Sequence, residues 1–227
     1  MTEAAFLARL SAAPPFAAVD EAVLARLPAE PAVKAFAKGA VLLAEGERPR
    51  AVHLLLSGGV ALTASGQGGQ STVISLLGRG DLVAVPPVLL GHVSPVGAVA
   101  AIASEAIALD AAALAEAIAA DAGLGQAVLT MLARHWFGLI EQMKDLKLHD
   151  SRTRVARWLA ESARGASGER IELAAPKAML ARNLGMTPES FSRALAALEA
   201  AGAIAAAGSS IAILDRGLLD PAGAGRG

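Results

Sequence analysis

Apolar residues follow three different periods along the chain. In residues 1–30 they recur at helical spacing between breaks at Pro14-Pro15 and Pro28, which predicts one or two short helices. From Val33 to about residue 109 the pattern changes to short apolar runs separated by glycine-bearing turns, which is typical of a β-sandwich or barrel. The predicted strands are Val41–Leu43, Val52–Leu56, Val60–Leu62, Ser71–Leu76, Leu82–Val85, Val96–Ile102 and Ala106–Leu109.

One long helix is predicted from Asp121 to Leu148, because its apolar residues repeat every 3.5 positions. Two registers fit that repeat. The first contains Val128, Leu132, His135, Leu139, Gln142 and Leu146, and the second contains Leu129, Leu132, Trp136, Leu139, Met143 and Leu146. We expect Val128, Leu132, His135, Leu139 and Leu146 at a homodimer interface, with His135 packed and not a ligand. The alternative is one amphipathic helix buried within its own chain.

The stretch from residue 175 to residue 202 contains two helical patterns split by a turn at Gly185. The first runs from Pro176 to Asn183. The second opens at Thr187, whose hydroxyl can cap the helix, followed by Pro188 in the first turn. After a preceding helix over 153–164 and a short strand at 171–173, this arrangement predicts a helix-turn-helix that reads DNA with the start of its second helix.

Two short apolar runs between Ile204 and Leu214 are joined by Gly208-Ser209-Ser210 and predict a β-hairpin. A helix-turn-helix followed by such a hairpin is a winged helix. The side chains expected to contact DNA are Thr187, Pro188, Glu189, Ser190, Ser192, Arg193, Lys177 and Ser209. An ordinary helical hairpin in a globular core is the alternative that the pattern alone leaves open.

The motifs Thr187–Arg193, Leu198–Gly202 and Ile211–Arg216 resemble the CRP/FNR superfamily of bacterial transcription regulators, and within it the DNR branch that regulates denitrification. The resemblance implies that Glu189, Ser192 and Arg193 read a TTGAT-like half-site in double-stranded DNA. The chemistry agrees, because a guanidinium matches guanine O6 and N7 and a carboxylate accepts from cytosine N4. RNA polymerase would be a further partner if the protein activates transcription.

The portion from Val33 to about Leu109 resembles the cyclic-nucleotide-binding barrel of the same superfamily, through Gly39, Glu45-Gly46, Gly58–Val60 and Gly78–Asp81. Nucleotide-binding members then carry Gly-Glu and Arg-Ser, whereas this chain reads Ala84–Pro87 and Val93–Val96. No arginine lies between Arg79 and Arg134 to meet a cyclic phosphate, so cyclic AMP is not expected. Cysteine is absent, which excludes a cysteine-ligated iron–sulfur cluster.

The sequence pattern therefore leaves the identity of the effector undecided. The DNR resemblance implies haem and a gas such as nitric oxide or carbon monoxide, and His92 is the candidate ligand. The expected pocket residues are Val85, Leu89, Leu90, His92 and Val96. In the alternative, His92 is an exposed loop residue, His53 faces solvent from a strand, and the pocket holds another small molecule or nothing.

The fold expected is α+β: a sensor barrel (jelly roll) with N-terminal helices over 1–120, a dimerisation helix over 121–149, and a winged-helix domain over 150–220. Residues 1–149 hold 10 Lys and Arg against 13 Asp and Glu, and residues 150–227 hold 10 against 8, so the rear part is the more basic. The tail after Asp215 is expected to fray.

No enzyme motif is found, so the chain is not expected to be an enzyme. No apolar run reaches the ~18 residues of a membrane span and no secretory signal opens the chain, so we expect a cytoplasmic protein without a membrane partner. The alternative function is a cyclic-nucleotide-binding-like scaffold or small-molecule binder that does not read DNA.

Overall fold

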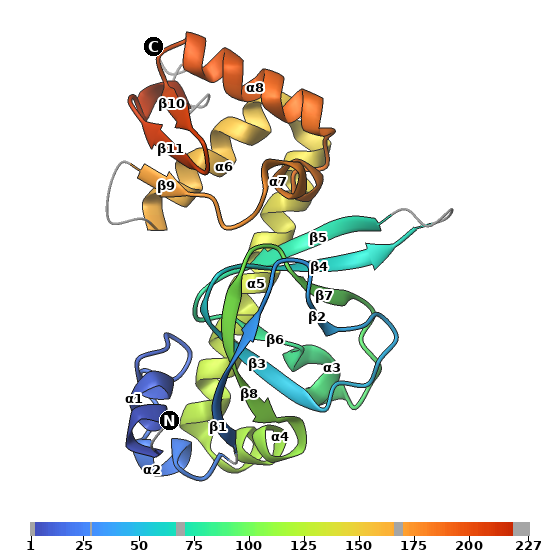
Figure 1. Ribbon diagram of the computed structural model, residues 1–227, viewed down its shortest axis with the longest axis vertical. Helices are drawn as coiled ribbons and strands as arrows, with labels where there is room; N and C mark the ends of the chain where they lie inside the picture. The colour runs from blue at the N-terminus through green and yellow to red at the C-terminus, as the bar shows by residue number, and fades with distance from the viewer. Residues whose placement is uncertain (1–2, 28, 67–70, 166–169, 220–227) are drawn as a thin grey trace. The chain divides into compact units, whose positions relative to one another are not determined.

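The computed structural model describes residues 3–27, 29–66, 71–165 and 170–219 (Figure 1). The chain divides into two compact units, Met1–Gly138 and Leu139–Gly227. The division falls within one long helix, α5 (Ala122–Leu148), so the first part of this helix belongs to one unit and its last part to the other.

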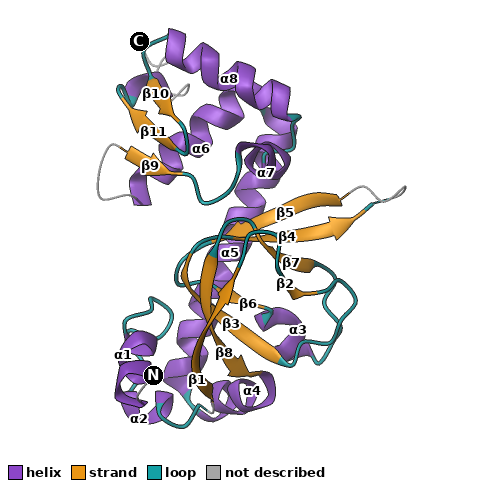
Figure 2. Cartoon of the chain, viewed as in Figure 1, coloured by secondary structure: helices purple, strands orange, loops and turns teal. Residues whose placement is uncertain are grey.

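The described residues of the first unit form eight strands in two four-stranded antiparallel sheets (Figure 2). The expected barrel is therefore a jelly-roll sandwich of two sheets. One sheet has the order β1-β8-β3-β6, formed by Ala29–Phe36, Ser104–Asp110, Ala51–Ser57 and Leu82–Val83. The other has the order β2-β7-β4-β5, formed by Val41–Leu43, Gly97–Ala100, Val60–Ser65 and Ser71–Leu77.

Side chains alternate between the two faces of the first sheet, and both faces are buried. Leu55 and Ala106 point between the sheets, where they pack with residues of the second sheet such as Val60 and Ala98. Leu54 and Ile107 lie on the opposite face in a second core. Helices cover that face: α1 (Glu3–Ser11), α2 (Glu21–Leu24), α4 (Ala111–Ala120) and the start of α5.

Four elements of this unit differ from the prediction. Strand β6 ends at Val83, because Ala84 adopts a left-handed backbone (φ 78°) and starts α3 (Val85–Leu90). Strand β1 and helix α4 are not among the predicted elements. The N-terminal helices α1 and α2 lie where the sequence pattern predicts them, although α2 is only four residues long.

The second unit contains α6 (Ser151–Gly165), β9 (Arg170–Glu172), α7 (Lys177–Asn183), α8 (Pro188–Ala200), β10 (Ile204–Ala207) and β11 (Ser210–Ile213). The carboxylate of Asp150 accepts a hydrogen bond from the amide of Thr153 at 2.8 Å and so caps α6. Leu159 is fully buried, and Trp158 contacts Phe191 of α8 with ring centroids 6.0 Å apart. This core holds α6 against α8.

The predicted fraying after Asp215 is wrong for residues 217–219. These residues form a short 3-10 helix whose Leu219 is fully buried. The rest of the predicted tail and the turn expected over residues 166–169 lie outside the described residues. In the part of the chain described, no single helix is long and apolar enough to cross a bilayer, and only the pair α4 and α5, bent by 111°, meets that criterion together.

Candidate DNA-binding surface and effector cavity

The helix-turn-helix is formed by α7, a tight turn and α8. Leu180 and Ala181 of α7 are buried, and the chain reverses through Gly185, whose backbone is left-handed (φ 63°). A side chain at Gly185 would collide with Leu146 of α5. The left-handed backbone favours glycine here, and a larger residue would also have to displace the end of the Leu146 side chain.

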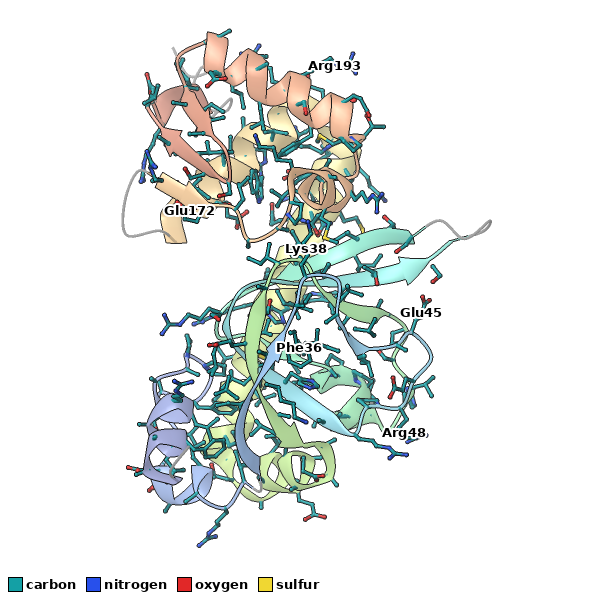
Figure 3. All side chains as sticks on the ribbon, in the orientation of Figure 1. Phe36, Lys38, Glu45, Arg48, Glu172 and Arg193 are labelled. Atoms are coloured by element: carbon teal, nitrogen blue, oxygen red, sulfur yellow. The ribbon has the colours of Figure 1, made fainter. Side chains whose placement is uncertain are left out.

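Helix α8 has one buried and one exposed face. Phe191, Ala194, Leu195 and Leu198 are buried against the rest of the unit. Glu189, Ser192 and Arg193 are all exposed, as the base-reading interpretation requires. Figure 3 shows Arg193 on the outer side of α8.

The N-terminus of α8 is held by a chain of hydroxyl contacts. The hydroxyl of Thr187 accepts from the amide of Ser190 at 3.2 Å, which is the predicted helix cap. The hydroxyl of Ser190 accepts from a guanidinium nitrogen of Arg193, also at 3.2 Å. Ser190 is half-buried, and its hydroxyl also accepts from the Thr187 hydroxyl at 3.2 Å.

The carboxylate of Glu189 stays ionised at lower pH than usual. Hydrogen bonds from its own backbone amide and from the Thr187 hydroxyl, with a smaller contribution from the charge of Arg193, lower the pKa of Glu189. An ionised, exposed carboxylate is a hydrogen-bond acceptor only. This is the state that contact with a cytosine amino group needs.

The predicted hairpin is confirmed, and it forms a three-stranded sheet of order β10-β11-β9. Its turn contains Gly208 and Ser209, while Ser210 belongs to β11 and is buried. Ser209 is exposed at the tip. Lys177, the first residue of α7, is half-buried, and Pro188 is exposed at the start of α8. All eight residues expected to contact DNA therefore lie in the second unit.

The last turns of α5 contact α7 and α6 through side-chain hydrogen bonds. The side-chain amide of Gln142 donates to the backbone oxygen of Asn183, at the end of α7. Arg157 of α6 donates to Asp145 at 2.8 Å. The pKa of Asp150 is lowered by the hydrogen bond from the Thr153 amide, so the cap that starts α6 remains charged.

The environment of α5 separates its two apolar registers. The residues found only in the first register turn toward their own chain: Val128 is 1% exposed in the helix-side core, His135 lies 2.9 Å from Asp81, and Gln142 binds Asn183. The residues found only in the second register are exposed, at 60% for Leu129, 64% for Trp136 and 52% for Met143. Val128 and His135 are therefore committed to intrachain contacts, contrary to the expected interface, because the first sheet and the turn before β6 occupy that side of α5. Leu139 and Leu146, common to both registers, remain partly exposed, and Leu132 is half-buried.

A cavity of about 280 Å³ opens inside the first unit between α3 and the second sheet. Leu90, His92 and Val96 line it, as predicted. Val85 does not, because it is buried in the helix-side core, and Leu89 is exposed elsewhere on α3. Among the described residues that line the cavity none is charged.

Neither His92 nor His53 belongs to a recognisable metal site. In the described part of the chain, no group of three or more His, Cys, Asp or Glu side chains converges as metal ligands would. His53 does not face solvent, because it is half-buried and its ring meets that of Phe36 edge-on, with the ring centroids 5.6 Å apart. Burial, and to a lesser degree the charge of Lys34, lower the pKa of His53.

Comparison with known proteins agrees with this architecture. Residues 33–121 match the Cyclic nucleotide-binding domain family, and residues 153–221 match the Crp-like helix-turn-helix domain family. No curated protein matches the chain at a significant level.

Solved structures are similar along most of the chain. FixK2 from Bradyrhizobium japonicum is 22% identical over 83% of this chain and 94% of its own, with a TM-score of 0.75. TTHB099, a CRP-family transcriptional regulator from Thermus thermophilus, is 22% identical over 84% and 96%, with a TM-score of 0.68. A protein from Silicibacter pomeroyi DSS-3, provisionally described as a cAMP-binding regulatory protein, is 25% identical over 97% and 99%, with a TM-score of 0.65. With a nucleotide-binding-type sandwich and a Crp-like helix-turn-helix in one polypeptide, the chain belongs to the CRP/FNR superfamily of transcription regulators.

Proposed function

We propose that this regulator reads a palindromic TTGAT-like DNA site as a homodimer. The observation that carries the proposal is the exposed face at the start of α8, where Glu189, Ser192 and Arg193 stand on the first two turns above a fully buried Phe191. Arg193 would donate to guanine, Glu189 would accept from a cytosine amino group, and Ser192 would assist.

Binding to a labelled duplex tests the proposal. The duplex carries TTGAT and its inverted copy ATCAA separated by about four base pairs, so that the half-sites lie one helical turn apart. We expect saturable binding that an unlabelled copy of the same duplex displaces and that a duplex of the same composition in scrambled order does not. Equal displacement by both competitors would contradict sequence reading.

The dimer would form through the second register of α5. Three large apolar side chains recur every seven residues along α5 and are each more than half exposed: Leu129, Trp136 and Met143. A row of large apolar side chains this close together normally avoids contact with water. Pairing two copies along this stripe would bury them. A two-fold axis in the protein would then match the two-fold symmetry of the DNA site.

The effector would be a small uncharged molecule bound in the 280 Å³ cavity. Cyclic AMP, named for the relative from Silicibacter pomeroyi, needs a cation for its phosphate, and no charged residue is found in the described lining of this cavity. Haem with His92 as ligand fits less well than a smaller apolar ligand for two reasons. The 280 Å³ cavity is slightly smaller than the ~300–1,000 Å³ typical of ligand sites. Its described lining also offers no cation to the haem propionates. An absorption spectrum of the purified protein with added haemin decides between them: a Soret band altered by His92→Ala would support haem.

An effector acts in this proposal by favouring the conformation that binds DNA. A tenfold preference for that conformation corresponds to about 1.4 kcal/mol.

Such a protein is a regulator and not an enzyme, and RNA polymerase would be a partner only if the protein activates transcription. The alternative, a scaffold or small-molecule binder of the same fold, predicts no sequence preference in the duplex assay.

A further inference from the structure

A cavity larger than the one inside the sandwich lies elsewhere in the first unit. A cleft of about 510 Å³ lies between three segments far apart in sequence: the loop after α1, the turn before β6, and the first turns of α5. Pro14, Pro15, Ala18, Ala127 and Met131 supply most of its apolar surface. A smaller cavity of about 270 Å³ adjoins it and shares Pro14, Arg79 and Gly80.

Arginines that have no ion-pair partner among the described residues line both cavities. Arg79 and Arg134 line the larger one, and Arg9 joins Arg79 in the smaller. The larger cavity contains a single acid among its described lining, Asp81, and both oxygens of that carboxylate are already engaged. One lies 2.9 Å from His135, and the other accepts from the amide of Gly78 at 2.7 Å. Glu105 lines the smaller cavity, but no ion pair joins it to Arg79 among the described residues, and the exposed side chains of Arg79 and Arg134 are available to an anion.

The shape of the cleft depends on a glycine. Gly80 has a left-handed backbone (φ 89°), and a side chain there would come within 2.8 Å of the Pro14 ring. The turn that presents Arg79 is therefore held close against the loop after α1. The cleft is a defined feature of the packing and not a gap between loose segments.

The cleft also lies away from the proposed dimer seam. At 100° per residue, Thr130 and Arg134 of the cleft point roughly 120–160° away from Leu132 and Trp136 around α5, whereas Gln126 lies only about 60° from Leu129. A second copy paired along the seam would leave the part of the cleft that contains Arg134 accessible.

We propose that this cleft binds a small organic anion, an apolar body carrying a carboxylate or a phosphate, with Arg79 and Arg134 on the charged group. The apolar floor would hold the body, and a volume of 510 Å³ suits a ligand of that size. Guanidinium groups pair with both kinds of anion in a bidentate geometry. This site is separate from the effector cavity beside His92.

Titration calorimetry on the full-length protein tests the proposal with three probes of one shape: 1-naphthoate, 1-naphthyl phosphate and the uncharged 1-naphthalenemethanol. We expect at least one anion to bind with one site per chain and the alcohol to bind about tenfold more weakly. The tighter anion identifies the preferred charged group. Arg79→Gln and Arg134→Gln should each weaken the anion about fivefold or more.

Two control variants keep the test specific. Arg48→Gln removes the same charge on the other side of the unit, where Arg48 donates to the Gly91 oxygen, and His92→Ala alters the sandwich cavity. Neither should change the affinity for the anion. Equal binding of the alcohol, indifference to both arginine variants, or loss of binding in His92→Ala would overturn the proposal. No DNA enters the experiment, so its outcome is independent of the proposed DNA reading.

Discussion

The side-chain amide of Gln142 donates a hydrogen bond of 2.7 Å to the backbone oxygen of Asn183. This contact joins the long helix α5 to the last residue of α7, directly before the turn that leads into the recognition helix. Leu146 packs against Gly185 one helical turn further along α5. The two contacts fix the turn of the helix-turn-helix to the helix that, in our proposal, pairs the two subunits.

Replacing Gln142 by Met removes the donor and keeps most of the side-chain volume. We expect the second unit to lose about 1 kcal/mol of unfolding free energy, because the Asn183 oxygen loses its partner. Urea denaturation measures the change. Gln126→Met is the matched control, since Gln126 is exposed on the same helix and contacts only Thr130 at 3.4 Å through its side chain. An equal loss in both variants would show that the Asn183 contact contributes nothing specific.

Alanine at Gly185 should be costly mainly through its backbone conformation, with a smaller contribution from a side-chain contact. The residue must keep a left-handed backbone, and its new methyl group would meet Leu146. We expect a loss of about 1–3 kcal/mol in unfolding free energy. Gly208→Ala separates the causes, because Gly208 is also left-handed (φ 58°) but has open space around it. Its smaller expected loss reports backbone strain alone, and thermal unfolding of both variants would reveal whether the collision adds to it.

Arg193 and Lys177 are expected to act on DNA in different ways. Arg193→Ala should cost about 1–3 kcal/mol per half-site and relax the choice of base at the guanine, because a base contact is lost. Lys177→Ala should weaken all sequences similarly and reduce the slope of log K against log salt by about 1, because a phosphate contact is lost. Fluorescence anisotropy with site variants at several salt concentrations measures both effects. If Arg193→Ala keeps its selectivity, another residue reads the guanine.

Trp136 and Phe137 offer a paired test of the dimer seam. Both side chains are exposed, at 64% and 69%, but they point about 100° apart around α5. Trp136→Lys should shift the protein toward monomers, because it places a charge in the apolar stripe. Phe137→Lys should leave the dimer intact. Sedimentation analysis over a range of concentrations distinguishes these outcomes, and a dimer sensitive only to Phe137→Lys would move the interface to another face.

His53 should make the stability of the first unit depend on pH. Its folded pKa lies below the ordinary value of 6.5, so the unfolded chain binds the proton more readily. The free energy of unfolding is therefore not reduced by His53 above pH 6.5, and it decreases as the pH falls toward the folded pKa of His53. We expect His53→Gln to reduce the acid-side decline in unfolding free energy, measured by urea denaturation between about pH 8 and pH 5. A decline of the same size in the variant would assign it to other groups.

The helix-turn-helix could be predicted well from the sequence because its signals are local. Thr187, Pro188 and Gly185 each specify a cap, a first turn or a left-handed turn by their own chemistry. The alanine-rich helix α4 could not, because it lacks contrast between apolar and polar positions, although Asp110 accepts from the Ala113 amide as a visible N-cap. Helix α3 resembles the end of a strand because its apolar run is too short to show a period.

The two registers of α5 could not be separated from sequence, because both satisfy the same repeat. The choice depends on what packs against each side. Asp81, which binds His135, lies 54 residues before it in the chain, so no local sequence pattern predicts that contact. The same holds for the cleft that contains Arg79 and Arg134, which only the folded chain brings together.

The first turns of α5 meet three different environments around their circumference: Leu124 and Val128 face the core, Leu129 and Trp136 face water, and Thr130 and Arg134 line the cleft. Deleting one residue among the first of these turns would rotate every later position by 100°, so Val128 would leave the core and Arg134 would leave the cleft. This helix therefore tolerates changes in length only in steps that restore its phase, about seven residues at a time.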